Sequence, residues 1–299
     1  MRIIAAHICT CLCLGSLAIA QPAPQSVYAP PELPSESDGT NQGAVNLDFS
    51  AGYFSNYVFR GIEVFKDPED SEGLNLQFDG KLAFNLGKLP HPFVNLFANI
   101  KENDPVSRFQ EIRPTLGFDW TIKPLVISAG HTSYIYPDRD ESNTSEVFLQ
   151  IALDENVLFG GNAVPTPYAM AAYDYDLYDG IYFEAGLKYK LAFDEIGLTM
   201  RFSGAVSYLN GIEAQIPDDE GNLFPGIFTN ERTEDVSING LQRWQVGVVA
   251  DYSLNHLFDV SNRFGEWHIR GYLYYTDDLD DTIRTDSQLW GGAGISFSY

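Results

Sequence analysis

Cysteine is almost absent from this sequence, and its placement is informative. Among 299 residues there are three cysteines, Cys9, Cys11 and Cys13, all near the start. A disulfide framework or a cysteine-ligated metal site in the rest of the chain is therefore excluded.

Basic side chains are also few. The chain has 18 Lys and Arg against 41 Asp and Glu, a formal net charge of −23. Such a charge repels a phosphate backbone, so nucleic acid is not expected as a partner. A hydrophobic content of 44% argues against a disordered chain.

Long hydrophobic runs are missing after residue 20. Before it, a short basic start leads into an apolar stretch that ends in the small residues Ala18-Ile19-Ala20. This pattern predicts a cleaved signal peptide over residues 1–20. Residues 21–43 hold five prolines and predict an extended tether.

No later run approaches the ~20 apolar residues of a membrane-spanning helix. A membrane protein of this sequence must then be a closed barrel, because only helices and barrels satisfy their backbone in lipid. The last stretch supports this, since Ala293, Ile295, Phe297 and Tyr299 alternate with Gly292, Gly294, Ser296 and Ser298. It resembles the C-terminal strand of bacterial outer-membrane proteins, and the resemblance implies that Phe297 and Tyr299 form an insertion signal.

Similar alternation recurs along residues 44–299 and predicts about twelve antiparallel strands. The predicted strands are residues 44–61, 73–86, 92–101, 109–122, 125–136, 145–153, 166–177, 180–191, 196–210, 241–254, 266–275 and 285–299. An even number of strands, polar on one face and apolar on the other, is typical of an all-β, up-and-down transmembrane barrel. We therefore expect one barrel domain in the outer membrane of a Gram-negative cell.

Ionisable residues of one parity are predicted to face the lumen. The predicted lumen-lining set is Arg60, Lys81, Glu111, Arg113, Asp174, Asp176, Glu184, Lys188, Arg201, Arg243 and Arg270. Charges of both signs in a narrow lumen suit passage of small polar solutes. A lumen plugged by ion pairs, serving structure alone, is the alternative.

Most of the acidic excess falls in predicted loops. The loop acids are Asp138, Asp140, Glu141, Asp218, Asp219, Glu220, Asp277, Asp278, Asp280 and Asp281. They are expected to be solvated, to bridge to lipopolysaccharide through divalent cations, or to favour cation passage. The long connection over residues 211–240 is either a surface loop or an inward constriction.

Two motifs carry a family resemblance. The first is Ser55-Asn56-Tyr57-Val58-Phe59-Arg60-Gly61, and the second is Asp179-Gly180-Ile181-Tyr182-Phe183-Glu184. The chain resembles the largely uncharacterised TorF-type or Gcw_chp outer-membrane porins, although Ile62-Glu63-Val64 replaces their usual small hydroxyl residues. The resemblance implies a porin of unknown solute. The lumen parity of Arg60 suggests that it pairs with an inward carboxylate such as Glu184 or Asp176.

An enzymatic alternative rests on His131 and Ser133, which share one face of a predicted strand. Their parity points both side chains toward lipid, and no supporting carboxylate is identifiable, so no catalytic or metal site and no cofactor are expected. The expected function is a passive or weakly selective channel for small hydrophilic solutes. A non-conducting adhesive barrel and a lipid-modifying enzyme are the alternatives. Expected partners are outer-membrane lipids, lipopolysaccharide and the barrel-insertion machinery.

Overall fold

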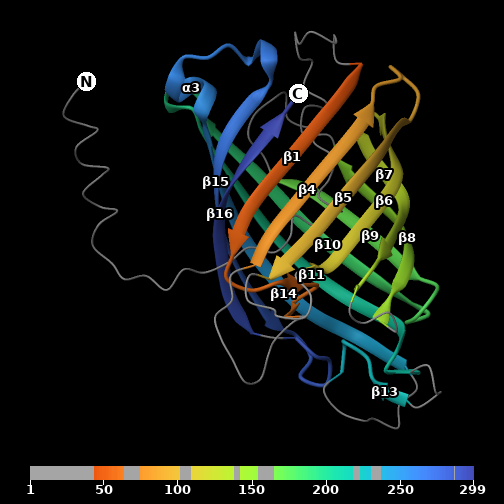
Figure 1. Cartoon of the computed structure of the whole chain (residues 1–299). Helices are drawn as coiled ribbons and strands as arrows, with labels where there is room; N and C mark the ends of the chain where they lie inside the picture. The colour runs from red at the N-terminus through yellow and green to blue at the C-terminus, as the bar shows by residue number, and fades with distance from the viewer. Residues whose placement is uncertain are drawn as a thin grey trace, which may run out of the picture.

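The alternating segments form a single closed sheet. The computed structural model describes residues 44–63, 75–101, 109–137, 142–153, 165–217, 223–229, 237–285 and 287–299. Twelve antiparallel strands close into a barrel (Figure 1). The predicted signal peptide and tether lie outside the described residues.

The barrel strands match the predicted segments closely. They are β1 (Val45–Phe54), β4 (Asn75–Phe84), β5 (His91–Lys101), β6 (Phe109–Ile122), β7 (Leu125–Tyr134), β8 (Thr144–Leu153), β9 (Thr166–Asp174), β10 (Gly180–Phe193), β11 (Leu198–Glu213), β14 (Ser237–Ser253), β15 (Glu266–Asp278) and β16 (Gln288–Ser298). The all-β, twelve-stranded antiparallel barrel expected from the sequence is confirmed.

The first and last strands close the barrel. In the β1–β16 register, Ser50 lies opposite Ser296 and Gly52 opposite Gly294. Beyond the ladder, the N–H of Leu47 donates to the carbonyl of Tyr299 at 2.7 Å, and the N–H of Tyr299 donates back at 2.8 Å. Closure leaves no strand edge unpaired, which is the condition for a sheet in lipid.

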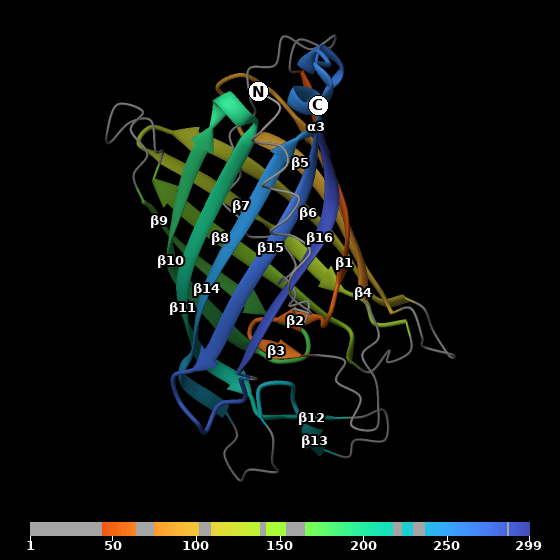
Figure 2. The same cartoon turned by 90° about the vertical axis from the view of Figure 1, so that its left-hand side faces the viewer.

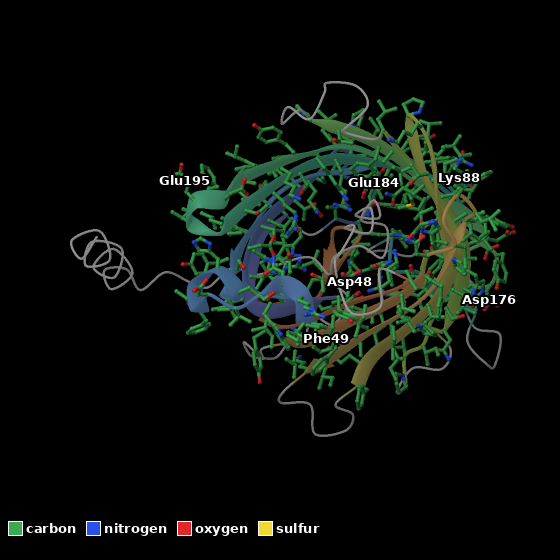
Figure 3. All side chains as sticks on the ribbon, turned by 90° about the horizontal axis from the view of Figure 1, so that it is seen from above. Asp48, Phe49, Lys88, Asp176, Glu184 and Glu195 are labelled. Carbon is green, nitrogen blue, oxygen red and sulfur yellow. The ribbon has the colours of Figure 1, made fainter. Side chains whose placement is uncertain are left out.

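The two faces of the wall differ as the alternation predicts. Viewed along the barrel, Asp48 points into the ring and the adjacent Phe49 points away from it (Figure 3). On β5, Val94 and Leu96 on the outer face are 42% and 53% exposed, whereas Asn95 and Phe97 on the inner face are buried. The barrel thus carries an apolar exterior and a polar interior.

The two ends of the barrel carry different connections (Figures 1 and 2). The C-terminus lies at one end with the helix α3 (Leu254–Phe258), and this end is called the terminal end. The short strands β2 (Val58–Phe59), β3 (Ile62–Glu63), β12 (Gln215–Pro217) and β13 (Leu223–Pro225) lie at the other, called the loop end. Among the described residues, no helix is long and apolar enough to cross a membrane.

The largest departure from a predicted strand boundary is at the end of the first strand. The first strand was expected to run to residue 61, but β1 ends at Phe54. The chain leaves the wall after Phe54, and at Arg60 and Gly61, whose φ are 49° and 80°, it turns back on itself between β2 and β3.

Candidate functional site

The segment that follows β1 enters the barrel. Residues 55–63, hereafter the inward hairpin, contain β2 and β3, with Phe59 paired to Ile62. Figure 2 shows β2 and β3 near the loop end of the barrel. Val58 and Ile62 are 1% and 0% exposed, although they belong to no barrel strand. The first motif of the family resemblance is therefore an element inside the lumen.

Aromatic side chains hold the inward hairpin against one side of the wall. Tyr57 stacks on Phe97 of β5 with ring centroids 5.9 Å apart, and Phe59 packs on Tyr134 of β7 at 5.3 Å. These residues and Tyr136 form one buried cluster. Burying such large rings removes much apolar area from water, so the hairpin position is strongly favoured.

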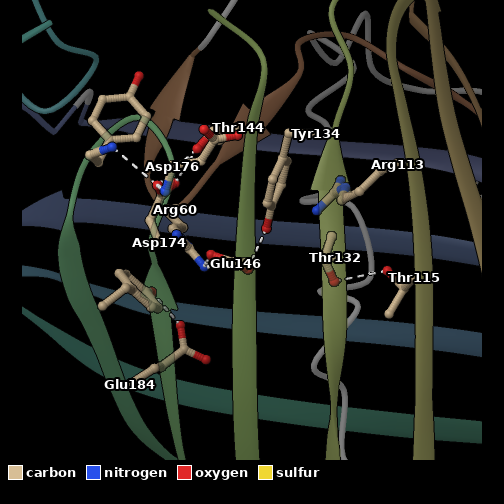
Figure 4. Close-up of polar contacts among 12 residues, drawn as sticks. Arg60, Arg113, Thr115, Thr132, Tyr134, Thr144, Glu146, Asp174, Asp176 and Glu184 are labelled. Carbon is tan, nitrogen blue, oxygen red and sulfur yellow. Dashed lines mark hydrogen bonds and ion pairs between the residues drawn. The ribbon is translucent and has the colours of Figure 1, made fainter.

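Arg60 fixes the tip of the hairpin. Its Nη2 lies 2.8 Å from Oε2 of Glu146 on β8, and the side chains are 9% and 0% exposed. The hydroxyl of Tyr134 donates to the same carboxylate at 2.6 Å (Figure 4). Arg60 thus pairs with an inward carboxylate, but this is Glu146 rather than Glu184 or Asp176, the examples expected from parity, because the hairpin turns toward β8.

A second ion pair lies beside the start of the hairpin. Arg113 Nε is 3.0 Å from Glu111 Oε1 on the same strand, β6. The hydroxyl of Tyr57 donates to Glu111 at 2.7 Å and accepts from Arg113 at 3.1 Å. Since both ions are almost fully buried, they need each other and Tyr57 to offset their lost hydration.

A third ion pair supports the hairpin from β10 and β14. Arg243 Nη2 lies 3.0 Å from Glu184 Oε2, and Tyr182 donates to the same carboxylate at 2.7 Å. The neighbouring Gln242 donates from Nε2 to the carbonyl of Arg60 at 2.9 Å. The predicted lumen residues around the hairpin thus form a dry, connected network.

Toward the terminal end the lumen charges are partly exposed. Lys81 of β4 and Asp119 of β6 pair at 2.6 Å with side chains 24% and 15% exposed. Across the barrel, Arg201 of β11 and Arg270 of β15 both contact Asp251 of β14 and remain 28% and 14% exposed. The interior therefore has a buried, ion-paired part at the hairpin, hereafter the dry part. Beyond it lies a part with accessible charged side chains, hereafter the wet part.

The remaining predicted lumen residues, Lys188, Asp174 and Asp176, differ in where their side chains lie. Lys188 faces inward and lies over the Tyr168 ring, 4.9 Å from its centroid. Asp174 is buried, but it accepts from Thr144 and from the N–H groups of the turn after β9, so it shapes that turn. Asp176 does not line the lumen: β9 ends at Asp174, and Asp176 lies exposed in the turn.

The long connection between β11 and β14 packs over the loop end. In its described part, Phe228 is 2% exposed and meets Tyr178 edge to face at 5.8 Å. Phe228 and Ile216 join a cluster that also contains Ile62 of the inward hairpin. The hairpin that enters the lumen is thus residues 55–63, and Ile216 and Phe228 of the described part of the connection pack against it. The acids of residues 138–141 and 218–220 lie outside the described residues.

His131 and Ser133, on which the enzymatic alternative rests, each form a hydrogen bond with a different residue. His131 Nε2 lies 2.7 Å from the hydroxyl of Tyr175, and the hydroxyls of Ser133 and Ser145 are 3.2 Å apart. Within the described ranges, no group of three or more His, Cys, Asp or Glu side chains is placed to hold a metal ion.

At the terminal end, Phe297 packs on Trp267 with centroids 4.7 Å apart, next to the paired backbone of Tyr299.

The sequence reasoning missed the hairpin aromatics Tyr57 and Phe59. The signal for this hairpin was Arg60-Gly61, a polar dipeptide that favours a turn, directly after two bulky residues. The predicted first strand over residues 44–61 included this dipeptide, so the turn was overlooked.

Comparisons with known proteins give distant structural likenesses. No protein-family profile matches the sequence, and no curated protein matches it significantly. An outer membrane channel from Pseudomonas putida F1 has a TM-score of 0.46 and 12% identity, over 85% of this chain and 94% of that chain. The translocator domain of the autotransporter NalP from Neisseria meningitidis has a TM-score of 0.39 and 10% identity, over 86% and 88%. A triple mutant of the Rhodopseudomonas blastica porin has a TM-score of 0.33 and 8% identity, over 86% and 99%. The functional argument therefore rests on the residues of this barrel.

Proposed function

We propose that this chain is an outer-membrane channel for small hydrophilic solutes, narrowed by the inward hairpin. The observation that carries the proposal is the wet part of the lumen. Lys81, Asp119, Arg201 and Arg270 face inward yet keep 14–28% of their side chains exposed. Charged groups in a barrel interior stay hydrated where water, and hence a small polar solute, can reach them.

The exterior supports a lipid environment. Large apolar side chains on the outer face remain exposed around the barrel, including Leu116 at 60%, Leu289 at 56% and Leu187 at 52%. A soluble monomer seldom exposes so continuous an apolar surface. Membrane lipids therefore cover this band, and lipopolysaccharide meets the loop end. The first motif of the TorF-type or Gcw_chp resemblance builds the hairpin, and the second lies at the start of β10, so membership of that family is part of the proposal.

The C-terminal strand is part of the same proposal. Phe297 and Tyr299 are the residues that the barrel-insertion machinery reads, after export through the cleaved signal peptide of residues 1–20. No catalytic role is assigned to His131 and Ser133, because each has a hydrogen-bond partner of its own on the outer face.

A second candidate function has an observation of its own. The ion pairs Arg60–Glu146, Arg113–Glu111 and Arg243–Glu184 leave at most 10% of any side chain exposed. If the hairpin seals the lumen permanently, the chain is a non-conducting barrel that acts through its loops.

Solute flux separates the two candidates. The mature chain is refolded into liposomes, and swelling is followed in iso-osmotic solutions of neutral sugars of increasing size. The channel proposal predicts swelling that falls steeply with sugar size. Swelling equal to that of protein-free liposomes for every sugar, with the barrel shown to be inserted, supports the sealed barrel.

A further inference from the structure

The connection between β14 and β15 exposes large apolar side chains at the terminal end of the barrel (Figure 1). It contains α3 and the 3₁₀-helix η3 (Asn262–Phe264), and residues 254–265 are hereafter the β14–β15 turn. Its side chains of Leu257, Phe258, Val260 and Phe264 are 51–68% exposed. Turns that meet only water usually present polar side chains, so this apolar surface indicates a contact with something other than water.

The polar groups of the β14–β15 turn are used inside it. Asn255 is 4% exposed, its Nδ2 donates to the carbonyl of Gly265 at 2.9 Å, and its Oδ1 accepts from the N–H of Trp267 at 2.8 Å. The hydroxyl of Ser253 accepts from the N–H of His256 at 3.1 Å. These hydrogen bonds hold the turn in one shape while its apolar side chains remain exposed.

The β14–β15 turn joins the wall beside an aromatic pair on the outer face. Trp267 lies opposite Phe297 in the strand register, and their rings are in contact. A Cβ added to Gly265 would overlap the ring of Phe297. Phe264 is three residues from Trp267, a span of at most ~10 Å. Aromatic side chains at the ends of an apolar band mark the boundary between lipid head groups and acyl chains, so the turn lies next to this boundary.

Charge does not explain the exposed surface of the β14–β15 turn. Its charged side chains, Asp259 and Arg263, have opposite signs, so the turn has no net formal charge when His256 is neutral. Apolar contact must therefore supply the attraction for whatever covers it, and the apolar band of the wall already meets lipid under the proposed function.

We propose that the β14–β15 turn is a lipid-binding foot, with Phe258 and Phe264 inserted between the head groups and acyl chains of the leaflet at the terminal end. Leu257 and Val260 extend the same contact. Interfacial segments of other proteins bury their apolar side chains about 5–10 Å into this boundary. The inference rests on the lipid environment of the proposed function, but it is independent of conduction.

Spin labels on single cysteines test the proposal in the full mature chain, refolded into phosphatidylcholine vesicles. Electron paramagnetic resonance measures how often each label collides with oxygen, which concentrates in lipid, and with a water-soluble nickel chelate. Labels at Phe258→Cys and Phe264→Cys are expected to favour oxygen, as does the lipid reference Leu116→Cys on the outer wall. Asp281→Cys, exposed at the loop end, is the water reference and favours nickel. Heat-dependent gel mobility shows that each variant is folded.

A double variant tests whether the phenylalanines hold the turn in lipid. With the label at Leu257→Cys, Phe258→Ser/Phe264→Ser is expected to raise the nickel collision rate at least about threefold, because less apolar area anchors the turn. Leu86→Ser/Leu89→Ser is the control. It makes a similar change in the turn between β4 and β5, at the same end, where these residues are 50% and 62% exposed, and it leaves the rate at position 257 unchanged.

Nickel-favoured collisions at both phenylalanine positions, with the Leu116 label in lipid, overturn the lipid foot and leave the barrel in the membrane. Nickel-favoured collisions at Leu116 as well contradict the lipid environment itself, and with it the proposed function. An unchanged nickel rate at position 257 in Phe258→Ser/Phe264→Ser, or an equal rise in the control, also overturns the lipid foot.

Discussion

Arg60, at the tip of a hairpin that enters the lumen, forms a buried ion pair with Glu146 on the wall of the barrel. The two groups lie 2.8 Å apart and are 9% and 0% exposed. Removing one partner of a buried pair leaves an uncompensated charge, which costs about 3–5 kcal/mol. The pair therefore fixes the inward hairpin and, with it, the free width of the lumen.

Replacing Glu146 by Gln is predicted to release the inward hairpin. Val58 is 1% exposed and the mature chain is predicted to lack cysteine, so Val58→Cys reports on opening. The labelling rate with a water-soluble maleimide is expected to rise at least about tenfold in Glu146→Gln, because opening becomes less costly. Glu195→Gln, exposed in a turn, serves as the control. An unchanged labelling rate in Glu146→Gln contradicts the assigned role of the pair.

Gly61 is predicted to be irreplaceable within the hairpin. Its φ is 80°, and a Cβ there lies 2.3 Å from Cδ of Arg243. Gly61→Ala is expected to suffer both a left-handed backbone penalty of about 1–2 kcal/mol and a steric clash. Gly211→Ala has a similar φ of 71° with open space, so it isolates the backbone penalty. Urea unfolding followed by tryptophan fluorescence should show a larger loss of unfolding free energy in Gly61→Ala than in Gly211→Ala. Equal losses in the two variants would exclude the clash.

The aromatic pair at the terminal end is predicted to stabilise closure. Phe297 and Trp267 have centroids 4.7 Å apart. Phe297→Leu is expected to lower the free energy of unfolding by about 0.5–1.5 kcal/mol beyond the lost area. Phe84→Leu, at an outward position that is 39% exposed, is the comparison. Heat-dependent gel mobility across a urea series measures the folded fraction, and identical midpoints would refute this role.

Tyr299 is predicted to matter for assembly more than for stability. Its contacts with Leu47 are made by backbone atoms, which any residue supplies. Tyr299→Ser should therefore refold in detergent with a yield within about twofold of the original, while its assembly into cell envelopes falls strongly. A parallel fall in the refolding yield and in the amount assembled into cell envelopes indicates a structural role for Tyr299 and contradicts its role as an insertion signal.

The barrel could be predicted from the sequence because alternation is a local property. On β6, predicted and observed as residues 109–122, outward-facing Leu116 and Phe118 alternate with buried Thr115 and half-buried Gly117 and Asp119. Each strand reveals its two faces in this way without reference to its neighbours. Arg113, Glu184 and Arg243, assigned to the inner face by parity, form the ion pairs beside the hairpin.

The inward hairpin could not be predicted in the same way. Parity assigns a face only while the chain stays in the wall, and after Phe54 it leaves. The partner of Arg60 is 86 residues away in the sequence, and Tyr57 contacts Glu111 across 54 residues. Such pairings depend on how strands curve around the lumen, which no local pattern contains.

Single-channel current across a planar bilayer tests the central claim most directly. The refolded mature chain is compared with a variant in which residues 56–62 are replaced by a Gly/Ser linker of the same length. If the hairpin constricts the lumen, the original chain gives small, discrete current steps and the variant gives larger ones, because its lumen is wider. Inserted barrels that give no steps in either form, or steps of equal size in both, contradict a channel narrowed by this hairpin.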